Sequence, residues 1–539
     1  MSPVLDQGAI TALSVTLRFR GDASGVTRLS WPDQWAGERK LGQWARAIRV
    51  VGARSVEVEA NGTRIIHAHP NAPLTVSYHI VSAYPADPNV EDSRQSAPIV
   101  RPRWFYAAGE ALFARPAGDR DEDRPARFVW AGPRTIGFAS DLQQHGRTLT
   151  LKNISESIVI GGHGLHVASH GAAGQQVRVA RIGHYAFAGP AFDTLVFKVI
   201  EAERAFWRVR EAEPFLVTMA PIAARPHLSS FSGTGRGDAF ALWMDTSAPL
   251  ERITWMLGHE YFHTWNNARL GRALSEPAER GYWFSEGLTD FYASRLMLRA
   301  GLISPEQFAV FWNEKLSRYA SSPFRTATND VVAAKFWSDP AAYDMQYQRG
   351  ALLAVLWDRR LRAAGKTDGL DSVLRTQAAR LVGLHDQPTA IDLFIDTARG
   401  FGLDVRPDIA AHIEYGEPLL LPENSFGPCA RIVTEDRARF ERGWDTDATS
   451  AADNVVTGLD PSSPAYAAGL RNGMKILQRL SGVPDDSRVD YVLRVADGAA
   501  EKVIRFRPAG KTHLTVQELV LDKTAIDAAP DRCRQALAG

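Results

Sequence analysis

Two histidines and a glutamate lie close together in residues 259–263, which read HEYFH. On a helix, residues four apart share a face, so His259 and His263 can direct both imidazoles at one metal ion. Glu260 would then face the same cleft, where a carboxylate can take a proton from water. The motif predicts two metal ligands and a general base, although two ordinary helix-surface histidines would give the same pattern.

A catalytic zinc ion takes three protein ligands and leaves a fourth position for water, so a third ligand is needed. Glu286 follows in a second apolar segment, and Asp290 comes one helical turn later. We expect Glu286 to complete the ligand set and Asp290 to accept the free ring N–H of a ligand histidine. Either acid alone reads as an ordinary helix-surface residue. The flanking residues favour a buried helix and a zinc site: Trp283, Phe284, Leu288 and Phe291.

Composition narrows the class of protein. A chain of 539 residues exceeds one hydrophobic core and predicts about three or four domains. Its 45% hydrophobic and 23% charged residues are ordinary for a globular protein. Net charge is +1 and no long basic run occurs, so we expect no nucleic-acid partner. No apolar stretch is long enough to span a membrane.

The first twenty residues alternate as a strand would and contain Asp6, unlike a signal peptide. We therefore expect a cytoplasmic protein, or a periplasmic or secreted one whose leader has been removed. The two cysteines, Cys429 and Cys533, have no metal-binding or redox spacing and fit two buried thiols. They also lie near the two ends of the expected last domain, where a disulfide would clamp it and indicate an oxidising compartment.

The hydrophobic pattern changes along the chain. Short alternating segments separated by turn residues predict an N-terminal antiparallel β domain over residues 1–165. A mixed and then helical region covers residues 166–420, and a proline-bearing linker spans 417–428. We predict a multidomain α+β protein whose last domain is 428–539. The expected strands are 13–19, 55–59, 74–81, 128–130, 148–151, 176–180, 214–219 and 239–243; the expected helices include 193–208, 351–358 and 370–381.

The last region resembles the bacterial PDZ domain. Residues 455–477 combine a strand, a Ser-Pro-Ala helix start and an Ala-Gly-Leu turn, with Asn472–Gly473 where Gly-Asp is usual. Upstream, Arg442, Gly443 and Trp444 resemble the loop whose amides hold a peptide carboxylate in that family. The resemblance implies that peptide C-termini bind here. A small β domain without a ligand is the alternative.

Three segments together resemble the bacterial glycyl aminopeptidases, metallopeptidase family sixty-one, which are gluzincins. They are HEYFHTWN at 259–266, WFSEGLTDFY at 283–292 and YQRGALLAVLWD at 347–358. The resemblance implies a thermolysin-like catalytic domain that binds one zinc ion and removes N-terminal glycine or alanine from peptides. It also implies that Tyr347, before Gln348-Arg349-Gly350, assists at the reacting carbonyl. A core tyrosine on a helix is the alternative for that residue.

One stretch departs from this family. Gly235 stands where members carry a glutamate that binds the substrate's free amine. Asp238 could anchor the amine instead and Arg236 could select an acidic group, although both also fit solvated loop charges. Two other functions therefore stay open: a zinc endopeptidase without an amine anchor, and a PDZ-type peptide-binding protein with a non-catalytic metal site. An intact Glu260 argues against the second, because a structural site needs no base.

Overall fold

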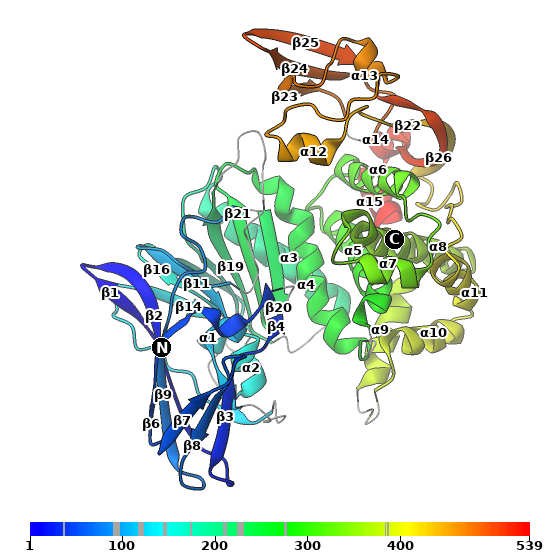
Figure 1. Cartoon of the computed structure of the whole chain (residues 1–539). Helices are drawn as coiled ribbons and strands as arrows, with labels where there is room; N and C mark the ends of the chain where they lie inside the picture. The colour runs from blue at the N-terminus through cyan, green and yellow to red at the C-terminus, as the bar shows by residue number, and fades with distance from the viewer. Residues whose placement is uncertain are drawn as a thin grey trace. The chain divides into compact units, whose positions relative to one another are not determined.

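The structure is a computed structural model of the whole chain. It describes residues 1–35, 38–89, 97–116, 123–143, 148–172, 175–208, 213–223, 231–273, 277–382, 384, 387–483 and 485–539. These residues form two compact units, Met1–Trp265 and Asn266–Gly539. Both α-helices and several sheets are present, so the protein is a multidomain mixed α/β chain (Figure 1). Within the described residues, no helix combines the length and hydropathy needed to cross a membrane.

The first unit begins with two antiparallel four-stranded sheets. Alternating residues of β2 and β9, such as Val15 and Val76, point into one core while their neighbours face outward. Strands predicted at 13–19, 55–59 and 74–81 are confirmed as parts of β2, β7 and β9. The first sheet consists of β1 (Ser2–Asp6), β2 (Ala9–Arg20), β9 (Pro73–Ile80) and β6 (Ala45–Val51); the second consists of β12 (Arg115–Pro116), β3 (Val26–Ser30), β8 (Arg64–His67) and β7 (Ser55–Val58).

Two predicted strands differ from the structure. Residues 128–130 have no regular secondary structure. Their apolar alternation has a different origin: the rings of Phe128 and Trp130 both stack on Phe138, with centroids 5.7 and 4.1 Å away. The expected strand at 148–151 is only β15 (Leu149–Thr150). Thr150 ends it by forming a capping box with Asn153, and this begins α2 (Leu151–Ser155).

A mixed five-stranded sheet forms the rest of this unit. Its central strands β19 and β21 are buried on both faces, which explains their nearly continuous apolar sequences. Ala241 and Trp243 pack against Ile158 and Ile160 of a four-stranded sheet on one side. The order is β17 (His166–His170), β18 (Val177–Arg181), β19 (Phe215–Ile222), β21 (Ala239–Asp245) and β20 (Phe231–Arg236); the neighbouring sheet has β10 (Ile99–Val100), β11 (Trp104–Ala108), β16 (Ile158–Gly162) and β14 (Gly137–Ser140).

Helices α3 (Gly189–Trp207) and α4 (Thr254–Arg269) cover the other face of this sheet (Figure 1). Side chains of α3, α4, β19 and β21 meet there around a small cavity. The Arg204 guanidinium donates to the Tyr261 hydroxyl at 2.9 Å, and the rings of Trp207 and Trp265 stack at 5.3 Å. These contacts fix the helix that carries HEYFH.

The second unit is helical up to residue 414. Two glycines set its central contact: a Cβ on Gly350 would come within 1.6 Å of the Trp283 carbonyl oxygen, and one on Gly287 within 2.3 Å of the Gly350 Cα. Helices α5 and α8 can therefore cross closely only because both positions are glycine. The predicted helices at 351–358 and 370–381 are confirmed. The helices are α5 (Tyr282–Arg299), α6 (Pro305–Ser321), α7 (Asn329–Lys335), α8 (Pro340–Ala363), α9 (Leu370–Leu381), α10 (Ala390–Gly400) and α11 (Arg406–Asp408), and a π-helix follows (Ile409–Glu414).

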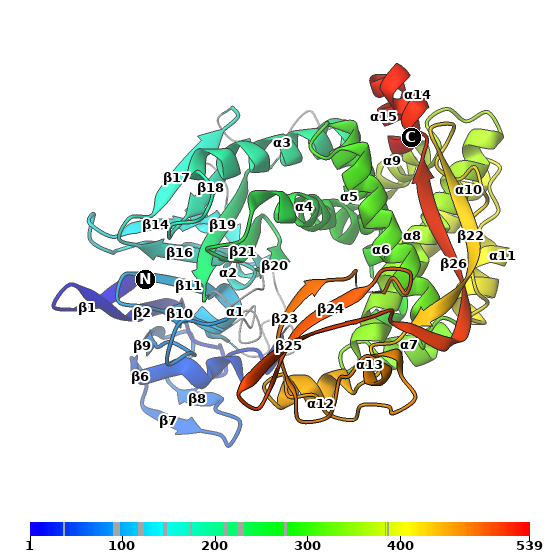
Figure 2. The same cartoon turned by 90° about the horizontal axis from the view of Figure 1, so that it is seen from above.

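Residues 417–429 have no regular secondary structure, as the predicted linker requires. Figure 2 shows β22 and β26 as one long ribbon and β23, β24 and β25 as a separate sheet. That sheet has a small core of its own, which includes Leu470, Tyr491 and Val495. The elements are β22 (Ala430–Phe440), α12 (Thr446–Ala451), α13 (Pro464–Ala467), β23 (Lys475–Ser481), β24 (Tyr491–Asp497), β25 (Ala500–Phe506) and β26 (Ala509–Leu521).

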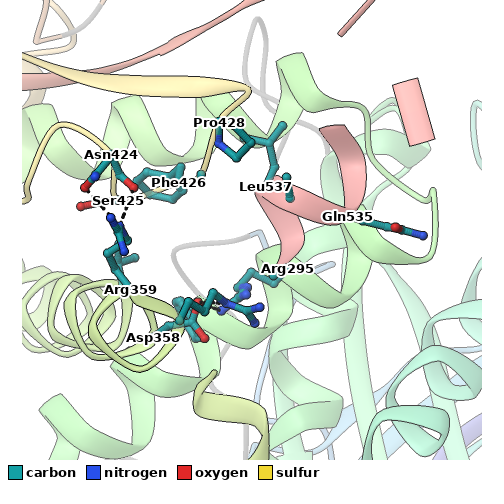
Figure 3. A pocket seen from close by; sticks show the side chains of 15 residues that line it. Arg295, Asp358, Arg359, Asn424, Ser425, Phe426, Pro428, Gln535 and Leu537 are labelled. Carbon is teal, nitrogen blue, oxygen red and sulfur yellow. Dashed lines mark hydrogen bonds and ion pairs between the residues drawn. The ribbon is translucent and has the colours of Figure 1, made fainter. Parts of the chain in front are cut away.

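A disulfide joins Cys429 to Cys533 in helix α15 (Pro530–Ala538). The Arg295 guanidinium donates to the Ala538 carbonyl oxygen and lies 3.0 Å from the Asp358 carboxylate. A cavity of about 480 Å³ opens beside this pair, with Arg359 bonded to Asn424 on its wall (Figure 3). Neither histidine of HEYFH lines this cavity. The Arg295–Asp358 ion pair and the disulfide beside it hold α15 against the rest of the unit.

Candidate metal centre

Helices α4 and α5 bring together the three predicted ligands. Ligand atoms of His259, His263 and Glu286 all lie within 4.8 Å of one another. His259 is buried, with 4% of its surface exposed, and the other two are partly buried. Two imidazoles and a carboxylate form the donor set that zinc takes in a catalytic site, with a fourth position for water.

The two histidines also fit the geometry of zinc. Their Nε2 atoms face one another at 3.1 Å. A tetrahedral zinc ion with bonds of about 2.0–2.1 Å separates two ligand nitrogens by about 3.3 Å. Because both Nε2 atoms point to the same place, each Nδ1 is left to bond elsewhere, which is the usual arrangement of a zinc histidine.

Glu260 lies beside strand β20. A Cβ built on Gly235 would be 3.4 Å from the Glu260 carboxylate, so the strand passes next to the predicted base with no side chain between them. Gly235 is exposed and Glu260 is partly buried. Gly235 therefore lies beside Glu260 without a side chain, and its correspondence to the amine-binding position stays a prediction.

Tyr347 lies on α8 one turn before the glycine crossing. Burial raises the pKa of its hydroxyl well above the ordinary value, and the negative charge of Glu286 raises it further. The hydroxyl is bonded to that of Tyr343 at 2.6 Å. Tyr347 consequently stays protonated at neutral pH, next to a predicted metal ligand, and can donate a hydrogen bond.

Asn266 ties α4 to α5. Its amide donates to the Ser285 carbonyl oxygen at 2.7 Å and also bonds the Thr289 hydroxyl. Asp290, the predicted partner of a ligand histidine, is 1% exposed and forms an ion pair with Lys315 of α6. Its proposed role in fixing a histidine tautomer stays a prediction.

Glu203 of α3 is a residue that the sequence did not reveal. It is fully buried, and within the described residues neither carboxyl oxygen has a hydrogen-bond partner. Burial raises its pKa well above the usual range, and interaction with His259 opposes that rise. Glu203 therefore interacts with His259 through its charge and not through a hydrogen bond. Its only sequence signal is one charged residue on the apolar face that α3 turns toward α4.

Arg236 lies away from the Gly235–Glu260 contact. Arg236 forms a buried ion pair with Glu110, and its guanidinium is 3.9 Å from the Trp35 ring centroid, on the opposite face of β20. Asp238 lies in the β20–β21 turn, where its charge helps burial to raise the pKa of Asp141 to about 7. The buried ion pair explains why Arg236 is not the solvated loop charge that the sequence alone allowed.

The predicted carboxylate loop has a defined shape. Gly443 has φ +88°, and a Cβ there would lie 2.5 Å from the Ser463 Cβ, so the turn requires glycine. The Gly443 carbonyl accepts from the Asp460 amide at 2.7 Å. Trp444 packs on Phe506 with ring centroids 6.1 Å apart, and the Arg442 guanidinium lies 5.7 Å from the Phe440 ring. The loop is thus packed onto the core of the small sheet.

Comparison with known proteins locates the strongest similarity at this site. The family model for M61 glycyl aminopeptidases matches residues 252–349, a segment that includes HEYFH, Glu286 and Tyr347. No curated protein sequence matches the chain. Among solved structures, an aminopeptidase N family protein from Idiomarina loihiensis has a TM-score of 0.70 at 15% identity, covering 98% of this chain and 97% of that chain.

Two further matches are more distant. An M1 zinc metallopeptidase from Deinococcus radiodurans has a TM-score of 0.47 at 17% identity, covering 78% of this chain and 94% of that chain. A single-residue variant of that enzyme bound to a Tyr-Ser-Ala substrate has a TM-score of 0.48 at 16% identity, with coverage of 78% and 93%. The first structure alone is similar enough to define the fold.

The fold, the His-His-Glu cluster and the matched family together support a zinc peptidase. Within that class, the chain resembles the M61 glycyl aminopeptidases over residues 252–349.

Proposed function

We propose that this protein is a zinc aminopeptidase that removes small residues, glycine or alanine, from the N-termini of peptides. The observation that carries the proposal is the cluster of His259, His263 and Glu286 with Glu260 on the same helix as the two histidines. A purely structural zinc site has four protein ligands and no use for a base. One zinc ion per chain is proposed.

The side chains divide the reaction between them. When bound, zinc supplies a Lewis acid that polarises the scissile carbonyl and acidifies water. Glu260 takes the proton of the attacking water and passes it to the leaving amine. The Tyr347 hydroxyl, which stays protonated, donates to the oxygen where negative charge develops. Asp290 accepts the free ring N–H of a ligand histidine and so orients that ring.

Recognition of the peptide's amine is proposed for Asp238. An acidic side chain near the metal fixes the ammonium group and so aligns the first peptide bond. Arg236 is committed to Glu110 and contributes to positioning β20. The family resemblance over the metal-site motifs favours this exopeptidase reading.

Gly235 favours the second candidate, a zinc endopeptidase. With no side chain beside Glu260, a peptide can continue past the scissile bond along β20. The third possibility, a peptide-binding protein with an inactive site, is disfavoured by the intact base.

We further propose that residues 428–539 form a PDZ-like domain that binds peptide C-termini at Arg442, Gly443 and Trp444, after an N-terminal β domain (1–165) and a thermolysin-like domain (166–420). The small sheet with its own core and the glycine-dependent turn at Gly443 support this arrangement.

End-blocked peptides test the exopeptidase proposal. Short alanyl and glycyl peptides should be cleaved with a free amine and resist cleavage when N-acetylated. Asp238→Asn should raise KM for the free peptide about tenfold, because a charge-assisted contact is lost. Asp436→Asn, which removes an exposed acid from β22, is the control. Cleavage of acetylated peptides at internal bonds, with Asp238→Asn silent, would establish the endopeptidase instead.

A further inference from the structure

Five aromatic side chains form a continuous row in the second unit. Tyr347 and Tyr343 of α8 have ring centroids 4.9 Å apart, and Tyr343 lies 4.8 Å from Phe336. Phe336 in turn lies 4.9 Å from Trp337 and 4.8 Å from Tyr282 at the start of α5. We call these five residues the aromatic row.

Exposure changes along the row. Phe336 is buried, with 4% of its surface exposed, while Tyr343 is 39% and Trp337 is 65% exposed. Large aromatic side chains are usually buried because their apolar area contributes strongly to folding. Two exposed rings that both pack on one buried ring, Phe336, therefore mark a surface available for binding.

Trp337 is exposed but not loose. Its indole N–H donates to the Glu279 carboxylate at 2.7 Å. The turn that carries Glu279 is itself fastened, since Gln346 donates to the Glu279 carbonyl and Asn329 to the Arg280 carbonyl. A ring held in place loses little conformational entropy when a ligand packs on it, which is why fixed aromatic side chains recur in binding surfaces.

One end of the row lies at the candidate active site. The hydroxyls of Tyr343 and Tyr347 are 2.6 Å apart. Tyr282 lies one helical turn before Glu286 on α5, and burial followed by the charge of Glu286 raises the pKa of Tyr347. The row thus runs from the predicted reaction centre to exposed surface.

We propose that the exposed faces of Trp337 and Tyr343 bind an aromatic or bulky apolar side chain on the residue that follows the scissile bond of the substrate. This inference rests on the proposed peptidase function and adds a substrate preference to it. An aromatic side chain suits the surface best, because rings pack favourably edge to face or offset against other rings.

A series of short peptides tests the proposal. The first residue is kept as alanine, as the proposed function requires, and the residue after the scissile bond changes from alanine to phenylalanine. The wild-type protein should prefer phenylalanine, with kcat/KM about three- to tenfold higher than for alanine. This ratio should fall to about one in Trp337→Ala and largely return in Trp337→Phe.

Tyr415→Ala is the matched control, since Tyr415 is an aromatic residue of the same unit with 70% exposure and lies outside the row. It should keep the wild-type ratio. Equal kcat/KM for alanine and phenylalanine after the scissile bond, or a ratio unaffected by Trp337→Ala, would overturn the inference. A change of oligomeric mass in Trp337→Ala with an unaltered ratio would identify a protein interface and overturn it as well.

A binding measurement separates this inference from the proposed function. Calorimetric titration of Glu260→Gln with alanyl-phenylalanine amide and with alanyl-alanine amide requires no turnover. Tighter binding of the phenylalanine peptide that depends on Trp337 supports the aromatic row; equal affinities contradict it. Failure of the wild-type protein to cleave any peptide would instead contradict the peptidase proposal.

Discussion

Tyr347 is the residue whose role depends most on its surroundings. From the sequence alone, this helical tyrosine fits a packing role in the core as well as a catalytic role. In the structure its hydroxyl is bonded to Tyr343 near Glu286, and burial and negative charge keep it protonated. A neutral phenol is a hydrogen-bond donor, which is what a developing oxyanion needs.

We predict that Tyr347→Phe lowers kcat by about a hundredfold, because a donor used in the transition state is lost. Zinc content should be unchanged, because no ligand is touched. Steady-state kinetics and elemental analysis measure the two quantities, with Tyr415→Phe as the control. An unchanged kcat would make Tyr347 a packing residue.

The ligands could be predicted from sequence because their signals are local. His259, Glu260 and His263 are neighbours on one helix, and the apolar segment around Glu286 indicates the second helix. Glu203 could not be predicted in this way, because it reaches His259 through packing of α3 on α4 and no spacing within the sequence encodes that contact. Tyr343 lies one helical turn before Tyr347 on α8, so its spacing was readable from the sequence, although its role was not.

At the scale of elements, the crossing of α5 and α8 depends on Gly287 and Gly350. Gly287 directly follows Glu286, and Gly350 lies three residues after Tyr347. A second buried position lies directly after β14, where the Asp141 carboxylate accepts from the Ile158 amide at 2.9 Å. Burial is the main cause that raises the pKa of Asp141 to about 7, and Asp238 adds to it.

This pKa predicts a pH dependence of stability. Between about pH 4 and pH 7 the unfolded chain has released the Asp141 proton while the folded protein keeps it, so stability falls as pH rises through this window. Asp141→Asn keeps an acceptor oxygen but no longer titrates. The change in free energy of unfolding caused by the substitution should be more stabilising at pH 8 than at pH 4, by about 4 kcal/mol at most.

Denaturant unfolding of the wild-type protein and Asp141→Asn at the two pH values measures the effect. A stability difference between them that does not change with pH would show that Asp141 is ionised in the folded protein.

At the scale of the whole molecule, periodicity predicted some of the regular elements but not their arrangement. Apolar alternation located β2, β7 and β9, and helical spacing located α9. It failed at residues 128–130, where Phe128 and Trp130 are apolar because they stack on Phe138. The pairing of Cys429 with Cys533 was one of two alternatives, because sequence position does not say whether two thiols meet.

The central claim is that this chain is a zinc peptidase in which His259, His263 and Glu286 bind the metal and Glu260 is the base. The most direct test combines elemental analysis with peptide hydrolysis by the wild-type protein and Glu260→Gln. We predict one zinc per chain in both proteins, loss of hydrolysis from the wild type on chelation with recovery on zinc addition, and turnover at least about a hundredfold lower in the variant. Stoichiometric zinc with near-normal turnover in Glu260→Gln, or wild-type hydrolysis that survives complete removal of zinc, would contradict the account.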